Sequence, residues 1–540
     1  MKRKFSLVFV LLVMAITAVH SQNHMDLIMT LTGEYVGSEY GTSVVSMDFN
    51  GDGYDDLIVK AALWHPECQV GDYQRMYGKI YFYWGGPDLS DQPDFVIEGQ
   101  HPLHFSGYTY SSLQNHMINA GDMNGDGIDD LVIPEQLADG TRTVSVYFGR
   151  AIPQTEPDIE LYYPQPDTRG IFVYPLGDIN GDGKDDISIL LIPGHTVPAA
   201  SILIWTDVFD NPVLFRTSAA FTDLCGVGDV NGDGFADMVH YNQVGEERSF
   251  SFYYGNETCS MADSLLIGTS SEPVDRYAGQ IGDVNGDGIP DFVSWKNKIW
   301  LGDSVIDSEP DIAIDIAPWL SFSYGMWPHI VHGDFNGDGY DDFAASDNRY
   351  AGMSGQAAIW LGSPNMNGTR DLALNPPDSY SYRNFGWSKA AGDFNGDGYC
   401  DLAVSAPIWT QGHTWYTAGK VFIYAGNAEL IDTTAANEDD VLPPALIEDW
   451  RIDLYPNPTP KDSPNLQVAF SGDAYSKVQD GITLQLYNLK GQRLFQKTLN
   501  PNSLQKSLLE LKLNKYPAGI YVINIKAKGN TKYSKRFCLM

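Results

Sequence analysis

Seven copies of one acidic nine-residue loop stand out in this chain of 540 residues. Each copy reads Asp-x-Asn-Gly-Asp-Gly-x-x-Asp, and the copies begin at Asp48, Asp122, Asp178, Asp229, Asp283, Asp334 and Asp393. Oxygen-bearing groups at alternate positions of a tight loop converge on one point, and Gly at position 6 permits the sharp turn. Three carboxylates, one amide and one backbone carbonyl form an all-oxygen set that suits Ca²⁺. Mg²⁺ demands a rigid octahedron, and zinc prefers Cys or His.

The sequence therefore predicts up to seven bound Ca²⁺ ions, one per loop. Side chains supply the oxygens at loop positions 1, 3, 5 and 9, and the backbone carbonyl supplies the oxygen at position 7. The predicted ligands are Asp48, Asn50, Asp52, Tyr54, Asp56, Asp122, Asn124, Asp126, Ile128, Asp130, Asp178, Asn180, Asp182, Lys184, Asp186, Asp229, Asn231, Asp233, Phe235, Asp237, Asp283, Asn285, Asp287, Ile289, Asp291, Asp334, Asn336, Asp338, Tyr340, Asp342, Asp393, Asn395, Asp397, Tyr399 and Asp401. The alternative for a single copy is an Asx-rich turn without metal. In seven copies, three crowded carboxylates would repel one another or take up protons unless a cation compensated them.

Short apolar strands, not helices, flank the loops. No loop has the Glu that an EF-hand needs at its twelfth position, and runs such as 57–59 and 131–133 follow directly. Each loop is therefore predicted to be the turn of a β-hairpin. In the first unit we expect strands at about 41–49, 54–63, 78–85 and 94–100.

Four antiparallel strands that recur seven times describe an all-β fold, a seven-bladed β-propeller over residues 22–426. Residues 26–32 resemble the fourth strand of a unit, although they precede the first unit, and no good fourth strand follows Gly426. We expect 26–32 to supply the outer strand of the seventh blade and so to close the ring. The alternative is a frayed tail.

The repeats resemble FG-GAP repeats, the integrin-α-type or VCBS-like family, over about residues 26–426. The matching features are the Tyr40-Gly41, Tyr324-Gly325 and Phe385-Gly386 lead-ins, the acidic loops, and third strands that end in Gly. The resemblance implies a seven-bladed propeller with Ca²⁺ in the loops between the first and second strands. Two features depart from integrins, which usually fill only three or four blades with metal. All seven loops here keep a full ligand set, and the chain contains no Arg-Gly-Asp tripeptide.

The N-terminal segment is predicted to be a signal peptide over residues 1–21. Three basic residues at 2–4 precede an apolar run at 5–19, and Ser21 lies just before the expected cleavage point. An uncleaved anchor helix is the alternative, but the run is short for a bilayer of about 30 Å. No later stretch is long and apolar enough to span a membrane, so the mature chain is expected to be secreted or held at the cell surface.

The C-terminal segment has a different charge. After a polar, acidic linker at 427–447, residues 448–540 carry a net charge of +7, whereas the rest of the chain carries −42. Alternating runs at 484–489, 507–513, 519–527 and 532–540 predict a small Ig-like β-sandwich.

The motifs LYPNP (454–458), LYNLKGQ (486–492) and PAGIYVINI (517–525), with Lys535-Arg536-Phe537, resemble the type A C-terminal sorting domain of the type IX secretion system. That resemblance implies the secretion machinery as a partner, export across an outer membrane, and attachment at the surface, often after removal of this domain. A generic accessory Ig-like domain is the alternative.

Composition excludes some partners and supports others. A net charge of −35 without a basic stripe excludes nucleic acid as a main partner. The five Cys residues form no disulfide framework. The motifs HExxH, G-x-S-x-G and Walker A are all missing from the sequence, so we expect no enzyme.

Aromatic loops could provide a binding surface on the face opposite the acidic loops. Residues 64–77 in blade 1 and 407–418 in blade 7 would become neighbours on ring closure. The candidate ligand-binding residues are Trp64, His65, Tyr73, Trp409, His413 and Trp415. Exposed Trp and Tyr are typical of binding hot spots and sugar platforms, and local loop packing is the alternative. The functions considered are an adhesion or interaction module for an extracellular protein, a carbohydrate-binding propeller, and a secreted polysaccharide hydrolase or lyase.

Overall fold

A computed structural model describes most of residues 24–431 and parts of residues 451–539. In the N-terminal part it describes residues 24–431 apart from 68–76, 101–115, 137–140, 164–167, 194–199, 219–221, 245, 260–263, 271–277, 295–297, 315–329, 349, 378–383 and 409–417. In the C-terminal part it describes residues 451–455, 465–471, 482–488, 493–499, 508–513, 519–527 and 530–539. The chain divides into two units, Met1–Ala435 and Ala436–Met540.

The described strands of the first unit form seven four-stranded antiparallel sheets. We call them blades 1 to 7 and label their strands A to D. Blade 1 is β2 (Tyr40–Met47), β3 (Asp56–Ala61), β4 (Lys79–Tyr83) and β5 (Phe95–Glu98); blade 2 is β6 (Ile118–Asn119), β7 (Leu131–Gln136), β8 (Arg142–Tyr147) and β9 (Ile159–Tyr163). Blade 3 is β10 (Thr168–Gly177), β11 (Asp186–Pro193), β12 (Ala200–Trp205) and β13 (Val213–Ser218); blade 4 is β14 (Thr222–Gly228), β15 (Asp237–Val244), β16 (Glu247–Tyr253) and β17 (Ser264–Ser270).

The remaining blades follow the same plan. Blade 5 is β18 (Ala278–Gly282), β19 (Asp291–Ser294), β20 (Lys298–Trp300) and β21 (Ile312–Ala313); blade 6 is β22 (Val331–Gly333), β23 (Asp342–Asp347), β24 (Gln356–Trp360) and β25 (Leu372–Leu374), with the short helix α1 (Tyr350–Met353) before β24. Blade 7 is β26 (Lys389–Gly392), β27 (Asp401–Ala406), β28 (Lys420–Ala425) and β1 (Asp26–Thr32). The strands predicted for the first unit are confirmed within a few residues.

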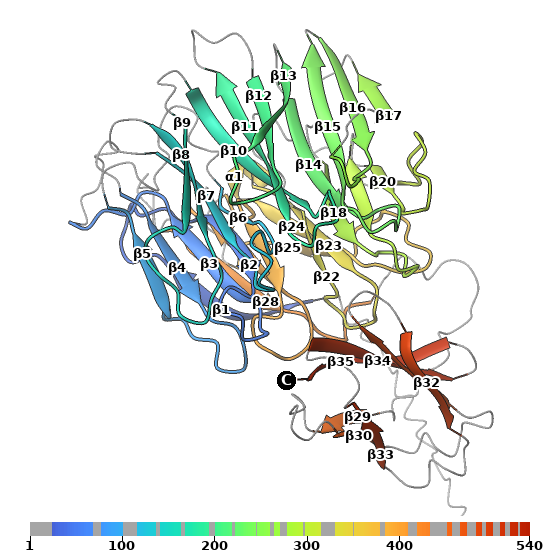
Figure 1. The fold of residues 1–540 in the computed structure, drawn as a ribbon. Coiled ribbons are helices and arrows are strands. Elements are labelled where there is room, and N and C mark those ends of the chain that lie inside the picture. Colours follow the sequence, from blue (N-terminus) through green and yellow to red (C-terminus); the bar gives the residue numbers. More distant parts are fainter. Residues whose placement is uncertain are drawn as a thin grey trace, which may run out of the picture. The chain divides into compact units, whose positions relative to one another are not determined.

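The seven blades form a closed ring. The A strand of each blade contacts the A strand of the next, and β26 of blade 7 contacts β2 of blade 1. In Figure 1 the colours run from the blue strands of blade 1 through green to the orange β28, which returns beside blue β1 and β2. The prediction of a seven-bladed propeller is confirmed.

Hydrophobic clusters fill the spaces between successive blades. Among the described residues, seven clusters each join side chains of two neighbouring blades, and together they cover all seven interfaces. The middle strands β3, β4, β23, β24 and β27 are buried at almost every position as a result. Since both faces of a blade are covered, these strands are nearly continuous apolar runs and do not alternate.

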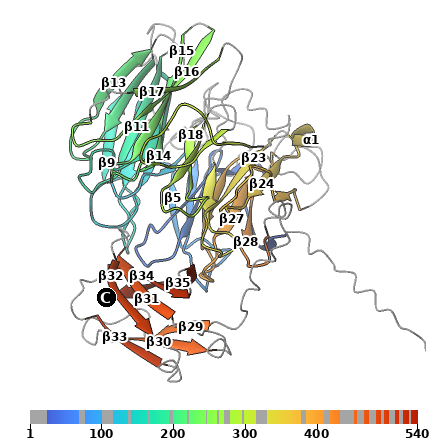
Figure 2. The same ribbon diagram turned by 90° about the vertical axis from the view of Figure 1, so that its right-hand side faces the viewer.

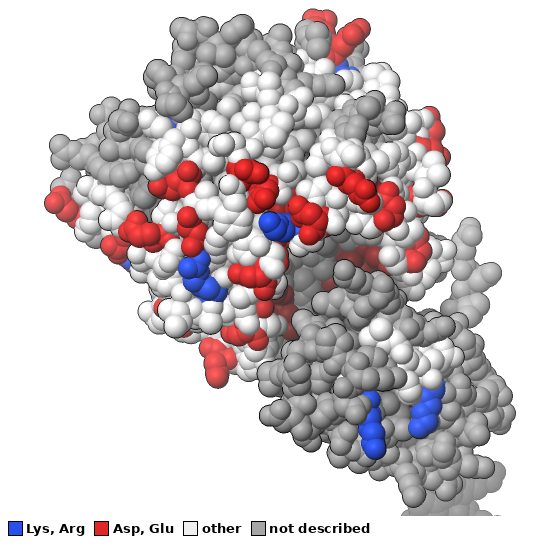
Figure 3. Space-filling view, in the orientation of Figure 1, with Lys and Arg blue, Asp and Glu red and all other residues white. Residues whose placement is uncertain are grey.

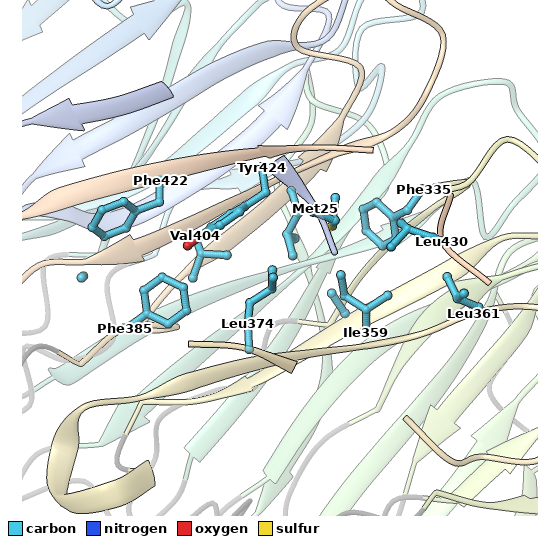
Figure 4. Packing of buried hydrophobic residues seen from close by; sticks show 14 residues of the cluster. Met25, Phe335, Ile359, Leu361, Leu374, Phe385, Val404, Phe422, Tyr424 and Leu430 are labelled. Atoms are coloured by element: carbon cyan, nitrogen blue, oxygen red, sulfur yellow. The ribbon is translucent and has the colours of Figure 1, made fainter. Parts of the chain in front are cut away.

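The first strand of the propeller closes the last blade. β1 pairs antiparallel with β28 from Asp26↔Ala425 to Thr32↔Lys420. Figure 4 shows Met25, just before β1, among side chains of blades 6 and 7, including Leu374, Val404 and Tyr424. The predicted closure is confirmed. The propeller also continues past the predicted boundary at 426, because Leu430 is buried in the same cluster.

The described residues of the second unit form seven strands in two antiparallel sheets (orange to red in Figures 1 and 2). One sheet is ordered β29-β30-β33 and the other β32-β31-β34-β35. The bounds are β29 (Arg451–Tyr455), β30 (Asn465–Ser471), β31 (Ile482–Asn488), β32 (Arg493–Leu499), β33 (Leu508–Lys512), β34 (Gly519–Ala527) and β35 (Asn530–Leu539). All four predicted runs are strands. Whether the sheets pack as an Ig-like sandwich stays a prediction.

Candidate cation-binding loops

All seven acidic loops connect strand A to strand B of a blade, as β2 and β3 show in blade 1. They therefore lie at the same end of every sheet and on one face of the ring. The glycine at position 4 has φ between +70° and +83°, and the glycine at position 6 has φ between +88° and +96°. Both values belong to the left-handed region that favours Gly. The repeated Gly-x-Gly thus gives the seven loops one backbone shape.

The position 1 carboxylate organises the tip of each loop. In blade 6 the backbone N–H of Asp338 donates to Asp334 Oδ1 (3.1 Å), and that of Gly339 donates to Asp334 Oδ2 (2.9 Å). The same two bonds occur in the other six loops. The position 1 carboxylate therefore points into the tip of the loop, where the chain turns.

Positions 3 and 5 lie beside each other at the same tip. In loop 6 the Asn336 Nδ2 donates to Asp338 Oδ2 (3.0 Å), and Asp338 Oδ1 accepts the N–H of Tyr340 (3.0 Å). The Asn-to-Asp bond occurs in loops 1 to 6 and the second bond in all seven. Two carboxylates and one amide oxygen are thus gathered at each tip.

The position 9 carboxylate lies beneath the loop and is fully buried in all seven copies. In blade 6, Asp342 Oδ2 accepts the N–H of Phe335 at position 2 (2.8 Å), and Asp342 Oδ1 accepts the N–H of Gly362 at the end of strand C (2.7 Å). This residue therefore ties its loop to the third strand of its own blade. The sequence predicted a ligand at this position but not this tie.

Burial raises the pKa of the position 9 carboxyl groups. The pKa reaches about 7 for Asp56, Asp130, Asp237, Asp291 and Asp401, and about 8 for Asp186. Desolvation is the main cause, and the negative charges at positions 1 and 5 raise it further. A bound cation would offset both effects.

The glycine that ends strand C lets the backbone approach the loop closely enough for this hydrogen bond. A Cβ on Gly362 would lie 2.2 Å from the carbonyl oxygen of Asp341. Contacts of 2.1 to 2.5 Å with the position 8 carbonyl recur at the equivalent glycines in five other blades, Gly85, Gly149, Gly255, Gly302 and Gly426. Blade 3 has Thr206 instead. There Asp186 Oδ1 is buried without a hydrogen-bond partner among the described residues.

The donor chemistry of the loops fits a hard divalent cation. Every candidate donor is an oxygen, and the buried Asp186 Oδ1 is an acceptor that no hydrogen bond from the described residues uses. Among the described residues, no group of three or more His, Cys, Asp or Glu side chains is already arranged around a metal position. The geometry explains this, because only positions 1 and 5 bring carboxylates to the tip, while position 3 is Asn and position 9 faces the sheet.

The structure gives two of the predicted aromatic-patch residues a packing role. Trp64 is 6% exposed, its Nε1 donates to Glu34 Oε2 (2.9 Å), and Lys79 Nζ lies 5.0 Å from its ring centre. His65 is 5% exposed and packs edge-on against Tyr77. For these two residues the structure shows the local packing that we considered as the alternative. Tyr73, Trp409, His413 and Trp415 lie outside the described residues.

Other predicted features are found as follows. Cys225, Cys259 and Cys400 are free thiols. Among the described residues, no helix is long and apolar enough to cross a bilayer. Figure 3 shows one face of the propeller, on which Asp and Glu side chains outnumber Lys and Arg.

Known protein families match both the propeller and the C-terminal unit. The FG-GAP repeat family matches residues 40–74 and 385–424, which belong to blades 1 and 7, and the secretion system C-terminal sorting domain matches residues 453–539. Integrin alpha-5 of Xenopus laevis is 26% identical over 166 residues, which is 29% of this chain and 15% of that protein. Integrin alpha-8 of Mus musculus is 32% identical over 127 residues, 23% of this chain and 11% of that protein. The matched segments thus span less than a sixth of these relatives.

A solved structure described as the Dos1 propeller has a TM-score of 0.36 and 11% identity, and it covers 73% of this chain and 95% of that chain. The family matches and the ring of blades, and not the likeness to this solved structure, identify the two parts of the chain. The chain therefore contains FG-GAP repeats in a seven-bladed propeller and, after them, a type IX secretion system C-terminal sorting domain, which indicates a secreted or outer-membrane surface protein.

Proposed function

We propose that the propeller is a calcium-binding adhesion or interaction module, displayed outside the cell by way of its sorting domain. The observation that carries the proposal is the sevenfold repetition of one loop geometry with only oxygen donors. The FG-GAP matches and the integrin-α relatives support the same role. The sorting domain supplies the contact with the secretion machinery, and the predicted signal peptide at 1–21 would supply the first export step.

Calcium would stabilise the propeller because it binds the folded loops and scarcely the unfolded chain. One site at a hundred times its Kd contributes about 2.7 kcal/mol to the free energy of unfolding. Oxygens at loop positions 1, 3, 5 and 7 would hold the ion at the tip, and the buried position 9 carboxylate, which also binds strand C, would complete the set from below. The ion would supply positive charge where carboxylates are crowded.

Thermal unfolding of the mature chain in a calcium titration tests the metal part. After chelation, added CaCl₂ should raise the Tm by at least about 5 °C, and MgCl₂ should act more weakly. Replacing the position 5 carboxylate by Asp338→Ala should remove one bound Ca²⁺ in calorimetry. Asp91→Asn, an exposed carboxylate outside the loops, should remove none. An unchanged Tm at millimolar calcium would end the calcium proposal.

The partner is proposed to be an extracellular protein, with a glycan as the alternative outcome. A glycan array with the mature chain, repeated with Trp409→Ala, separates the two, and Trp64→Ala serves as the control for lost packing because Trp64 is buried. Array binding that Trp409→Ala abolishes at an unchanged Tm would replace the protein-partner proposal by the lectin proposal. Turnover of a polysaccharide by the wild-type chain would contradict the non-enzymatic role.

A further inference from the structure

Successive acidic loops contact one another around the ring. The position 7 side chain of each loop lies against the position 4 glycine of the preceding loop. A Cβ on Gly286 would lie 2.3 Å from Tyr340, one on Gly181 would lie 2.6 Å from Phe235, and the same neighbour recurs at all seven positions. The loops are therefore parts of one continuous ring of contacts.

At four of the seven junctions, the backbone N–H of position 8 connects a loop to position 1 of the preceding loop. The N–H of Asp185 in loop 3 donates to the carbonyl oxygen of Asp122 in loop 2 (2.9 Å). The same bond joins Ala236 to Asp178, Asp341 to Asp283, and Cys400 to Asp334. These bonds hold the backbone of position 1, a predicted ligand, to the next blade.

A carboxylate at position 8 accepts the backbone N–H of position 1 of the preceding loop at three junctions, two of which also have the backbone bond. Asp185 Oδ2 accepts the N–H of Asp122 (2.9 Å), and Asp341 Oδ2 accepts the N–H of Asp283 (2.9 Å). Across the closure of the ring, Asp55 Oδ2 accepts the N–H of Asp393 (2.8 Å). We call this bond the position 8 clamp. It holds the first ligand residue of loops 2, 5 and 7.

Among the described residues, position 1 of the other four loops has no such bond. Position 8 is Ala236, Pro290 and Cys400 in the blades that follow loops 3, 4 and 6. Pro290 also lacks an N–H, so it cannot make the backbone bond to Asp229 of loop 4. Asp129, which follows loop 1, instead accepts a bond from Asn119 Nδ2 of its own blade (2.9 Å).

We infer that the position 8 carboxylate is a positioning residue for the cation site of the preceding loop, so that loops 2, 5 and 7 bind calcium more tightly than loops 1, 3, 4 and 6. Loop 4 is the weakest. A ligand whose backbone is already fixed loses less conformational freedom on binding. The inference rests on the calcium proposal above.

Calorimetric calcium titration of the full mature chain is the test. The wild type should show three tight sites and a weaker class. Asp185→Ala should move one site from the tight to the weaker class with about a tenfold loss of affinity, a size expected from one charge-assisted hydrogen bond, while the total number of sites stays the same. The matched control Asp129→Ala removes a position 8 carboxylate that makes no clamp, and it should leave both classes unchanged.

Two further variants separate positioning from a general loss of stability. In a chain whose loop 2 is disabled by Asp126→Ala, adding Asp185→Ala should change the titration no further. Pro290→Asp should add one tight site by creating the missing clamp at loop 4, a gain that damage to the fold cannot imitate.

The outcomes distinguish the two proposals. A wild type that binds no calcium overturns calcium binding itself. If the wild type binds calcium but neither Asp185→Ala nor Pro290→Asp changes the two affinity classes, the clamp is overturned and calcium binding stands. If Asp185→Ala fails to fold, Pro290→Asp decides, and an unchanged class count there contradicts the inference.

Discussion

At the scale of single residues, one buried carboxylate joins each acidic loop to its blade. Asp342 accepts one N–H from its own loop and one from Gly362, twenty residues later. Such a bond between a charged acceptor and a buried N–H is worth more than a neutral one, and it is costly to lose. The glycine is required because the backbone there approaches the carbonyl of position 8.

Substituting that glycine should destabilise the propeller. In Gly362→Ala the new Cβ would meet the Asp341 carbonyl oxygen at 2.2 Å, so backbone must move. We expect a loss of about 1–3 kcal/mol in the free energy of unfolding, the usual cost of overpacking. Urea unfolding measures it. Thr206→Ala is the control because blade 3 already accepts a Cβ there, and equal losses in both variants would contradict this account.

A buried lysine should make stability depend on pH. Lys389 in β26 is 3% exposed, its Nζ donates to Ser346 Oγ (2.6 Å), and burial lowers its pKa to about 7. Between pH 7 and 10 the unfolded chain keeps a proton that the folded chain has released. Stability relative to Lys389→Met should therefore rise with pH, by up to about 1.4 kcal/mol per pH unit.

Urea unfolding of both chains at several pH values checks this. Lys389→Arg keeps its charge over this pH range. Its free energy of unfolding should therefore not rise with pH and should stay below that of the wild type. A difference between wild type and Lys389→Met that does not change from pH 7 to 10 would show that Lys389 is charged in the folded chain.

Residue types and spacing predict which side chains gather at the loop tips, because a nine-residue turn is a local structure. They do not predict the second role of position 9, since its partner comes from strand C. Nor do they predict the clamp, since Asp185 and Asp122 are 63 positions apart and meet only because blades 2 and 3 pack side by side. The exposure assumed for Trp64 and His65 could not be deduced either, because Glu34 and Tyr77 cover them from other parts of the chain.

At the scale of elements, each blade is an antiparallel sheet covered on both faces. Strands such as β3 and β27 are buried on both faces and are recognisable as short apolar runs between turn signals. The sequence does not mark β12, β13 and β17 as repeat strands. β12 lacks the terminal Gly of the other C strands, and the exposed β13 and β17 carry mixed polar and apolar residues.

Substitutions in β1 should separate its packing face from its exposed face. Leu31 is 1% exposed and lies in the cluster between blades 7 and 1, whereas Leu27 on the same strand is 41% exposed. Leu31→Ala should cost about 2–5 kcal/mol and Leu27→Ala much less. Thermal and urea unfolding measure both. Similar small effects would mean that β1 contributes little to closure.

At the scale of the whole molecule, an acidic propeller and a basic sorting domain are two separate units. The family matches indicate what each unit is, because the sorting motifs and repeat motifs are local and specific. The ring follows from the repeat count, since seven blades with covered faces need a closed arrangement. The ligand does not follow, because much of the predicted aromatic surface lies outside the described residues.

Removing the sorting domain should stop export without unfolding the propeller. A chain lacking residues 453–539 should be missing from the cell surface and the medium in fractionation and immunoblotting. Its purified propeller should keep the thermal transition of the full chain. Normal surface display of the shortened chain would contradict the assigned role of the domain.

The pairing of β1 with β28 has a consequence for folding kinetics. Ser38 and Ala418, which hydrogen-bond beside this pair, are 380 residues apart in sequence. Contacts of such high separation form slowly, so blade 7 completes last, after synthesis of nearly the whole propeller. Until β28 has been synthesised, β1 lacks its partner strand and offers an unpaired edge to any other strand.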